Sequence, residues 1–165
     1  MQGGQESSDN WLMSSIKNKA GQLVGTFLLD MAGRGDSRLP WLVYLTFAYK
    51  NRPLPSSPEL DRFEEVDRII QALCAKHSAR NVAIWTRAGV RDWIVYAQDG
   101  GSFGDVALAA LRPFAVQIEV QADGVWKQYQ DFLEMLTLPN LDNRHRVANL
   151  WAAPAAPLLL VSLQP

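Results

Sequence analysis

The chain has 165 residues and a formal net charge of −1, from 16 lysines and arginines against 17 aspartates and glutamates. Hydrophobic residues make up 48% and charged residues 20%, the composition of a globular protein with a core of its own. The balanced charge gives no electrostatic reason to expect nucleic acid or an anionic membrane as partner. The single cysteine, Cys74, excludes an internal disulfide framework and a multi-cysteine metal site.

The N-terminal part predicts a disordered lead followed by a hairpin. Residues 1–9 are polar and lack the basic patch and apolar run of a signal peptide, so we expect a cytoplasmic protein. Apolar runs at 11–16 and 23–31 predict an N-terminal β-hairpin, with a short helix over 10–17 as the alternative.

A central strand and a long helix are predicted next. Residues 41–49 carry apolar groups on both faces, which is typical of a central strand. After a proline-rich break, an apolar stripe at helical spacing predicts a helix over 58–78. Its start fits either Ser57 as N-cap or a capping box of Ser56 with Glu59.

Residues 81–96 predict a second hairpin, which turns at Ala88 and Gly89. Pairing its arms about the turn sets Thr86 opposite Arg91. One face is apolar and is expected to pack beneath helices at 58–78 and 102–112. Its residues are Val82, Ile84, Trp93 and Val95. The pairing sets Val82 opposite Val95 and Ile84 opposite Trp93. The other face mixes aromatic and charged groups, and it either meets a partner or lies beneath another part of the chain. It carries Trp85, Arg87, Asp92, Ile94 and Tyr96.

The rest of the chain predicts two more helices and one strand. A glycine-rich turn at 99–105 leads into the helix at 102–112, with Ser102 and Asp105 as its expected cap. Residues 116–120 alternate as a strand with one wet face, and Asp123 is expected to cap a last long helix. A further short helix is possible at 141–151. The Ala/Pro and Leu-rich tail, 152–165, is too short and too interrupted by proline to span a membrane.

This order predicts an α+β fold. From residue 41 to 120 the elements read β-α-β-β-α-β, the pattern of a ferredoxin-like two-layer sandwich. The N-terminal hairpin and the extra C-terminal helices complete a single domain over 10–151.

Several phrases, in their order and spacing, resemble the bacterial domain of unknown function family 695 over about residues 10–150. The phrases are Leu54-Pro-Ser-Ser-Pro-Glu59, Thr86-Arg-Ala-Gly-Val-Arg91, Asp123-Gly-Val-Trp-Lys-Gln-Tyr129 and Asn143-Arg144. Longer members continue into a second half similar to the regulator of ribonuclease activity B, an RNase E inhibitor, where this chain has its Ala/Pro tail. The resemblance implies no established chemistry.

The residues favour a non-catalytic protein-binding or regulatory module, because no nucleophile, base and orienting group occur together. A protein partner or a second copy is expected to contact Trp85, Arg87 and Tyr96, or Leu158 and Leu160 of the tail. The alternatives are a small enzyme using Asp92, Asp99 or Asp123, and an RNA-binding domain that stacks bases on sheet aromatics. No cofactor, metal, nucleic acid or membrane is expected.

Four residues are candidates for a structural role or a site: Arg91, Asp92, Asp123 and Trp126. We expect Arg91 to be held at the turn end of its hairpin by a carboxylate such as Asp92, Asp99 or Asp123, since an arginine among aromatic groups needs a partner or an exit to water.

Overall fold

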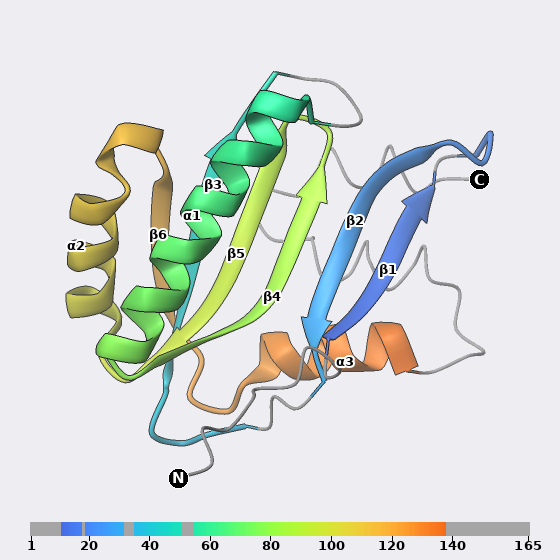
Figure 1. Cartoon of the computed structure of the whole chain (residues 1–165). Helices are drawn as coiled ribbons and strands as arrows, with labels where there is room; N and C mark the ends of the chain where they lie inside the picture. The colour runs from blue at the N-terminus through green and yellow to red at the C-terminus, as the bar shows by residue number, and fades with distance from the viewer. Residues whose placement is uncertain (1–10, 18, 32–34, 51–54, 138–165) are drawn as a thin grey trace, which may run out of the picture.

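The computed structural model describes residues 11–17, 19–31, 35–50 and 55–137, whose strands form a six-stranded antiparallel sheet (Figure 1). The strands lie in the order β1-β2-β4-β5-β3-β6. They are β1 (Trp11–Lys17), β2 (Leu23–Asp30), β3 (Trp41–Ala48), β4 (Ala79–Arg87), β5 (Val90–Ala97) and β6 (Gln117–Ala122). The helices are α1 (Ser57–Lys76), α2 (Gly100–Ala110) and α3 (Lys127–Thr137), with a 3-10 turn η2 (Arg112–Phe114).

The N-terminal hairpin and the central strand are confirmed. β1 pairs with β2, and β3 lies between β5 and β6. From β3 to β6 the elements follow the order β-α-β-β-α-β, and the β1–β2 hairpin extends the same sheet beyond β4. The sheet therefore has six strands instead of four.

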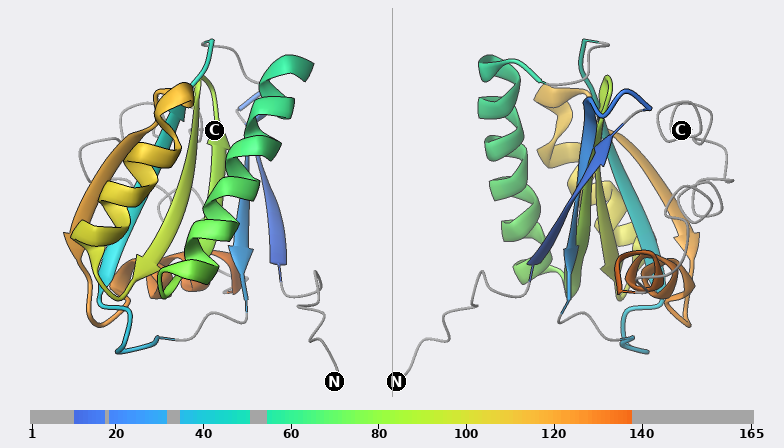
Figure 2. Two further views of the ribbon diagram at one scale, coloured as in Figure 1. Left: turned by 60° about the vertical axis from the view of Figure 1, so that its left-hand side comes forward. Right: turned by 90° about the vertical axis from the view of Figure 1, so that its right-hand side faces the viewer.

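Helices cover both faces of the sheet (Figure 2). α1 and α2 lie on one face, which we call the α1/α2 face, and α3 lies on the other, the α3 face. This departs from the two-layer expectation, because Leu42, Ile94 and Tyr96 make the second face apolar and it needs a cover of its own. None of the helices described is long and apolar enough to cross a membrane.

The α1/α2 face forms one core, as predicted. Trp93 and Val95 pack there with Phe63 of α1 and Phe103 of α2, and Ile84 adjoins this cluster. The pairings of Thr86 with Arg91 and of Ile84 with Trp93 are confirmed.

The placement of Val82 is wrong. The ladder shifts between Asn81 and Ala83, so Asn81 pairs with Val95. Val82 is the extra residue of this bulge, and its side chain is buried in the α3-face cluster instead. Strict alternation through the strand cannot reveal such an insertion.

Both helices on the α1/α2 face begin at side-chain caps. Ser56 and Glu59 form the capping box of α1, in which the Ser56 backbone N–H donates to Glu59 Oε2 at 2.6 Å. α2 is capped by Asp99, whose Oδ1 accepts from the Ser102 backbone N–H at 3.0 Å. The expected cap of Ser102 with Asp105 is therefore wrong, because Asp99 already satisfies this N–H and the helix starts two residues earlier.

We expect the Cys74 thiol to resist modification in the folded protein. Cys74 is buried on α1, and burial raises its pKa to about 12, partly offset by a hydrogen bond from the Asn81 backbone. At pH 8 only about one thiol in ten thousand is then a thiolate, the form that reacts. Labelling by a thiol reagent, measured by mass spectrometry, should be far slower in buffer than at a urea concentration that unfolds the chain. Equal rates would contradict the burial of this helix face.

Candidate functional site

The turn end of the β4–β5 hairpin carries two ion pairs, one on each face of the sheet. Arg91 and Asp67 form the first, on the α1/α2 face, with Nη2 and Oδ2 3.2 Å apart. Arg87 and Asp92 form the second, on the α3 face, with Nη1 and Oδ2 2.5 Å apart. The sheet thus separates two arginines that lie close together in the sequence.

Arg91 is held between aromatic rings and a helix carboxylate. Its guanidinium carbon lies 4.9 Å from the ring centre of Phe63 and 5.1 Å from that of Trp93. Its Nη1 donates to Thr86 Oγ1 at 2.8 Å, and Asp67 also accepts a hydrogen bond from Trp93 Nε1. Burial lowers the pKa of Arg91, and the nearby Asp67 carboxylate opposes this effect. The cluster fastens α1 to the sheet.

Arg91 has a carboxylate partner, as the sequence predicts. The partner is Asp67 of α1, and not one of the predicted examples, Asp92, Asp99 or Asp123. Adjacent strand residues point to opposite faces, so Asp92 cannot reach Arg91's side of the sheet. Helical spacing could have identified Asp67 as the partner. It lies four residues after Phe63 and therefore on the same side of α1.

Arg87 and Asp92 are buried on the α3 face. Their side chains are 7% and 5% exposed, and Thr46 Oγ1 donates to Asp92 Oδ1 at 2.6 Å. Trp85 and Tyr96, on the same face, have no exposed surface. Neither ring is open to a partner in this conformation, and the partner contacts expected at Trp85, Arg87 and Tyr96 remain a prediction.

Asp123 ties the end of β5 to the start of α3. Its Oδ2 accepts from the Tyr96 hydroxyl at 2.6 Å, and its carboxylate also accepts from the backbone N–H groups of Lys127 at 2.8 Å and Gln128 at 3.0 Å. The Tyr96 hydroxyl in turn accepts from the Tyr129 backbone N–H at 3.2 Å. The expected cap is confirmed, and the carboxylate has a structural role.

Trp126 anchors the loop that precedes β3. Its ring stacks on Tyr96, with centres 4.0 Å apart and planes 11° from parallel. Its Nε1 donates to the backbone carbonyls of Leu39 at 2.9 Å and of Asp36 at 3.1 Å. The residue has a φ of 57°, a left-handed conformation that costs a bulky residue about 1–3 kcal/mol and persists because these contacts hold it.

Two tyrosines, Tyr96, which is buried, and Tyr44, which is partly buried, predict a loss of stability in alkali. Burial raises the pKa of Tyr44 and of Tyr96 above the ordinary value of 10.0, and the Asp123 carboxylate raises that of Tyr96 further. Above pH 10 the unfolded chain releases protons that the folded chain retains, so stability is full below pH 10 and falls as the pH rises. We expect urea midpoints to fall above that pH, and to fall less steeply in Tyr96→Phe. An equal slope in the variant would remove Tyr96 from this explanation.

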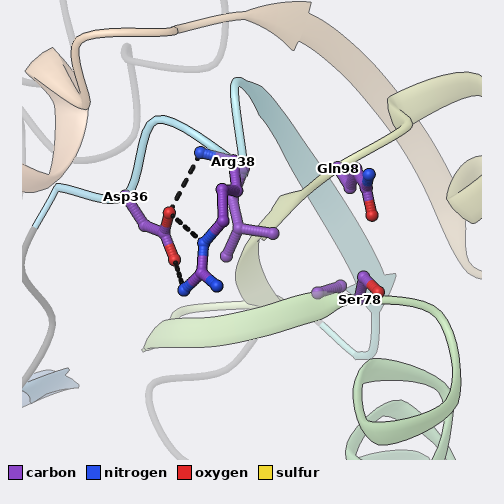
Figure 3. A pocket seen from close by; sticks show the side chains of 6 residues that line it. Asp36, Arg38, Ser78 and Gln98 are labelled. Atoms are coloured by element: carbon purple, nitrogen blue, oxygen red, sulfur yellow. Dashed lines mark hydrogen bonds and ion pairs between the residues drawn. The ribbon is translucent and has the colours of Figure 1, made fainter.

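One shallow hollow of about 300 Å³ lies where the loop before β3 meets the α1–β4 turn (Figure 3). Asp36, Arg38, Ser78 and Gln98 line it, and Figure 3 shows Asp36 and Arg38 joined to each other. The Arg38 guanidinium donates to both Asp36 oxygens, at 3.0 and 2.9 Å, and this pairing lowers the pKa of Asp36 and raises that of Arg38. Both charges are thus already satisfied by each other.

An exposed apolar strip lies along the β6 edge of the sheet, and sequence reasoning missed it. Trp41, Val120 and Leu108 are 40%, 38% and 55% exposed; we call these three residues the edge strip. A Cβ on Gly100 would lie 2.6 Å from Val120 and 2.8 Å from Trp41, so α2 begins directly against both. Leu108 lies one turn beyond Gly104, which also faces Val120. The signal in the sequence was the pair Gly100 and Gly104, four residues apart.

The remaining candidates form no shared centre. Asp92 is bound to Arg87 and Thr46, Asp99 caps α2, and Asp123 caps α3. In the part of the chain that the structure describes, no three His, Cys, Asp or Glu side chains gather as metal ligands. Leu158 and Leu160, and the possible helix at 141–151, lie outside the described residues.

Comparison with known proteins identifies a family but no characterised relative. A family described as "Family of unknown function (DUF695)" matches residues 9–134, most of the chain. No curated protein and no solved structure matches it. Function must therefore be inferred from the geometry.

Proposed function

The chain belongs to the DUF695 family of unknown function, and from this premise we propose that it is a non-catalytic module that binds another protein, in a regulatory role. The observation that carries the proposal is the edge strip. Trp41, Leu108 and Val120 expose apolar surface beside β6, the last strand of the sheet as described. Aromatic and aliphatic groups of this kind anchor protein interfaces.

The edge of β6 adds a second mode of contact. In an antiparallel sheet the outer strand presents backbone N–H and C=O groups that a partner strand can pair with. The side chains of β6 that point to the α3 face, Gln117, Glu119 and Gln121, are exposed and polar. An extended partner segment would pair with β6 and lay an apolar side chain on the edge strip.

The enzyme alternative has less support. Its three carboxylates bind an arginine or cap helices, on separate elements of the fold. An acid or base in catalysis needs a proton to transfer within hydrogen-bond reach of a substrate. The RNA alternative needs open aromatic rings on the sheet, whereas Trp85 and Tyr96 have no exposed surface.

The test is a comparison of charged variants at the two edges of the sheet. Leu108→Lys with Val120→Lys places two charges in the edge strip, and Met13→Lys is the matched control, an exposed apolar residue on β1 at the opposite edge. Proteins retained by the wild-type chain from a lysate should be lost with the double variant and kept with the control. Circular dichroism should report the same fold for all three proteins.

Two results would count against this function. Equal retention by the double variant and the control would remove the edge strip as the binding surface. Turnover of a small substrate by the purified chain, abolished by Asp92→Asn or Asp123→Asn in a folded protein, would favour the carboxylate enzyme.

The proposal also includes the finer classification of the chain. The segment from β3 to β6, with strand order β4-β5-β3-β6 and α1 and α2 on one face, supports a ferredoxin-like unit extended by the β1–β2 hairpin. A cytoplasmic location, and a domain that continues to residue 151, remain predictions.

A further inference from the structure

The end of the α3 face beside the Ala88–Gly89 turn is buried, although no described helix lies over it. Arg87 and Asp92 are almost fully buried there, and Trp85 beside them has no exposed surface. Among the helices of residues 11–137 as described, α3 alone lies on this face, and it crosses the opposite ends of the strands (Figure 1). The described helices therefore leave the turn end of this face without a helix over it.

The contacts of α3 set the limit of its coverage. Tyr129 donates from its hydroxyl to the Asp30 carbonyl at 2.8 Å, at the end of β2, and Trp126 stacks on Tyr96 near the end of β5. Phe132 reaches Phe27, in the middle of β2, with ring centres 5.0 Å apart. These contacts leave the half of the face that carries Arg87 and Asp92 for another segment.

We propose that the C-terminal segment of the same chain, residues 138–165, docks on this half of the α3 face. The segment starts where α3 ends and is therefore already on the correct side of the sheet. Ten extended residues span roughly 33 Å, whereas an eight-residue strand such as β2 is about 27 Å long. The segment is long enough to reach the turn end with residues to spare.

Its composition fits the surface it covers. The run Leu158-Leu-Leu-Val-Ser-Leu163 supplies aliphatic side chains for the rings of Trp85 and Tyr44. Residues 1–10 are mostly polar, and residues 51–54 are a short stretch between β3 and α1 in the chain. Neither of these segments offers a comparable apolar cover.

Docking here stands apart from the proposed function, because the edge strip lies beside α2, on the other side of the sheet. A cover over this end of the face also keeps water away from the Arg87–Asp92 pair, whose side chains are 7% and 5% exposed.

Hydroxyl-radical footprinting of the full chain and of a chain ending at Thr137 tests the proposal. Oxidation of Trp85 should rise in the shortened chain toward that of exposed Trp41, while Trp93, on the α1/α2 face, stays protected in both. Trp85 that remains as protected as Trp93 would overturn the proposal. If Trp93 is oxidised as well, the shortened chain has unfolded, and the full chain decides.

In the full chain, a photo-crosslinking residue identifies the occupant directly. Gln117 is exposed, lies on the α3 face and pairs with Thr46, the neighbour of Asp92. Gln117→p-benzoylphenylalanine should crosslink within one chain to residues 138–165, whereas the control Asp105→p-benzoylphenylalanine, on exposed α2, should not. Crosslinks to residues 1–10, to 51–54 or to a second copy, or none at all, would overturn the proposal.

Discussion

Trp93→Ala is expected to lower the free energy of unfolding by about 3–5 kcal/mol, the range for removing a large aromatic side chain from a core. Trp93 has no exposed surface, and its ring contacts Phe63 of α1 at 6.3 Å between centres. The substitution also removes one ring from Arg91 and the indole donor from Asp67. Urea unfolding followed by far-ultraviolet circular dichroism measures the loss.

Trp93→Phe is the matched control for this variant. It keeps an apolar ring in the core but removes the hydrogen bond to Asp67 and part of the indole volume, so we expect a smaller loss than for alanine, about 1–3 kcal/mol. A loss well under about 1 kcal/mol for Trp93→Ala would place this residue outside a packed core. It would thereby contradict the face assignment of the hairpin.

Arg87→Met is expected to cost about 3–5 kcal/mol, because it leaves the Asp92 carboxylate buried without its cation. Thr46 still donates to Asp92, but one hydroxyl offsets only part of the cost of burying a charge. Replacing both partners, as Arg87→Met with Asp92→Leu, should cost less than the sum of the single changes. The double-mutant cycle in urea gives this coupling.

The control is a lysine–aspartate ion pair on the surface. Lys127 and Asp131 lie one turn apart on α3, with Nζ and Oδ1 2.7 Å apart, and their side chains are 72% and 32% exposed. Lys127→Met should change stability by no more than about 0.5 kcal/mol, since water screens such a pair. An Arg87→Met cost as small as this would mean that the turn end of the α3 face is wet.

Local patterns were sufficient for the elements on the α1/α2 face. The alternation in 81–96 placed Ile84 opposite Trp93 and Thr86 opposite Arg91, because a tight turn at Gly89, with φ of 79°, leaves little choice of register. The helical stripe likewise identified the buried side of α1, including Phe63 and Cys74. These features depend on neighbours within a few residues along the chain.

Contacts between distant segments decided the rest. Asp67 is 24 residues from Arg91 in sequence, and only the packing of α1 on the sheet makes it the partner. The bulge at Val82 places the Val82 side chain on the α3 face, and the alternation of apolar and polar residues does not reveal the bulge. The sequence by itself determined that Trp85, Arg87 and Tyr96 share a face. The position of α3 and of the Trp126 ring decided that the end of this face at Tyr96 is interior. An amphipathic pattern shows which side of a helix or strand is apolar. Which other element buries that side depends on how all the elements of the domain pack together.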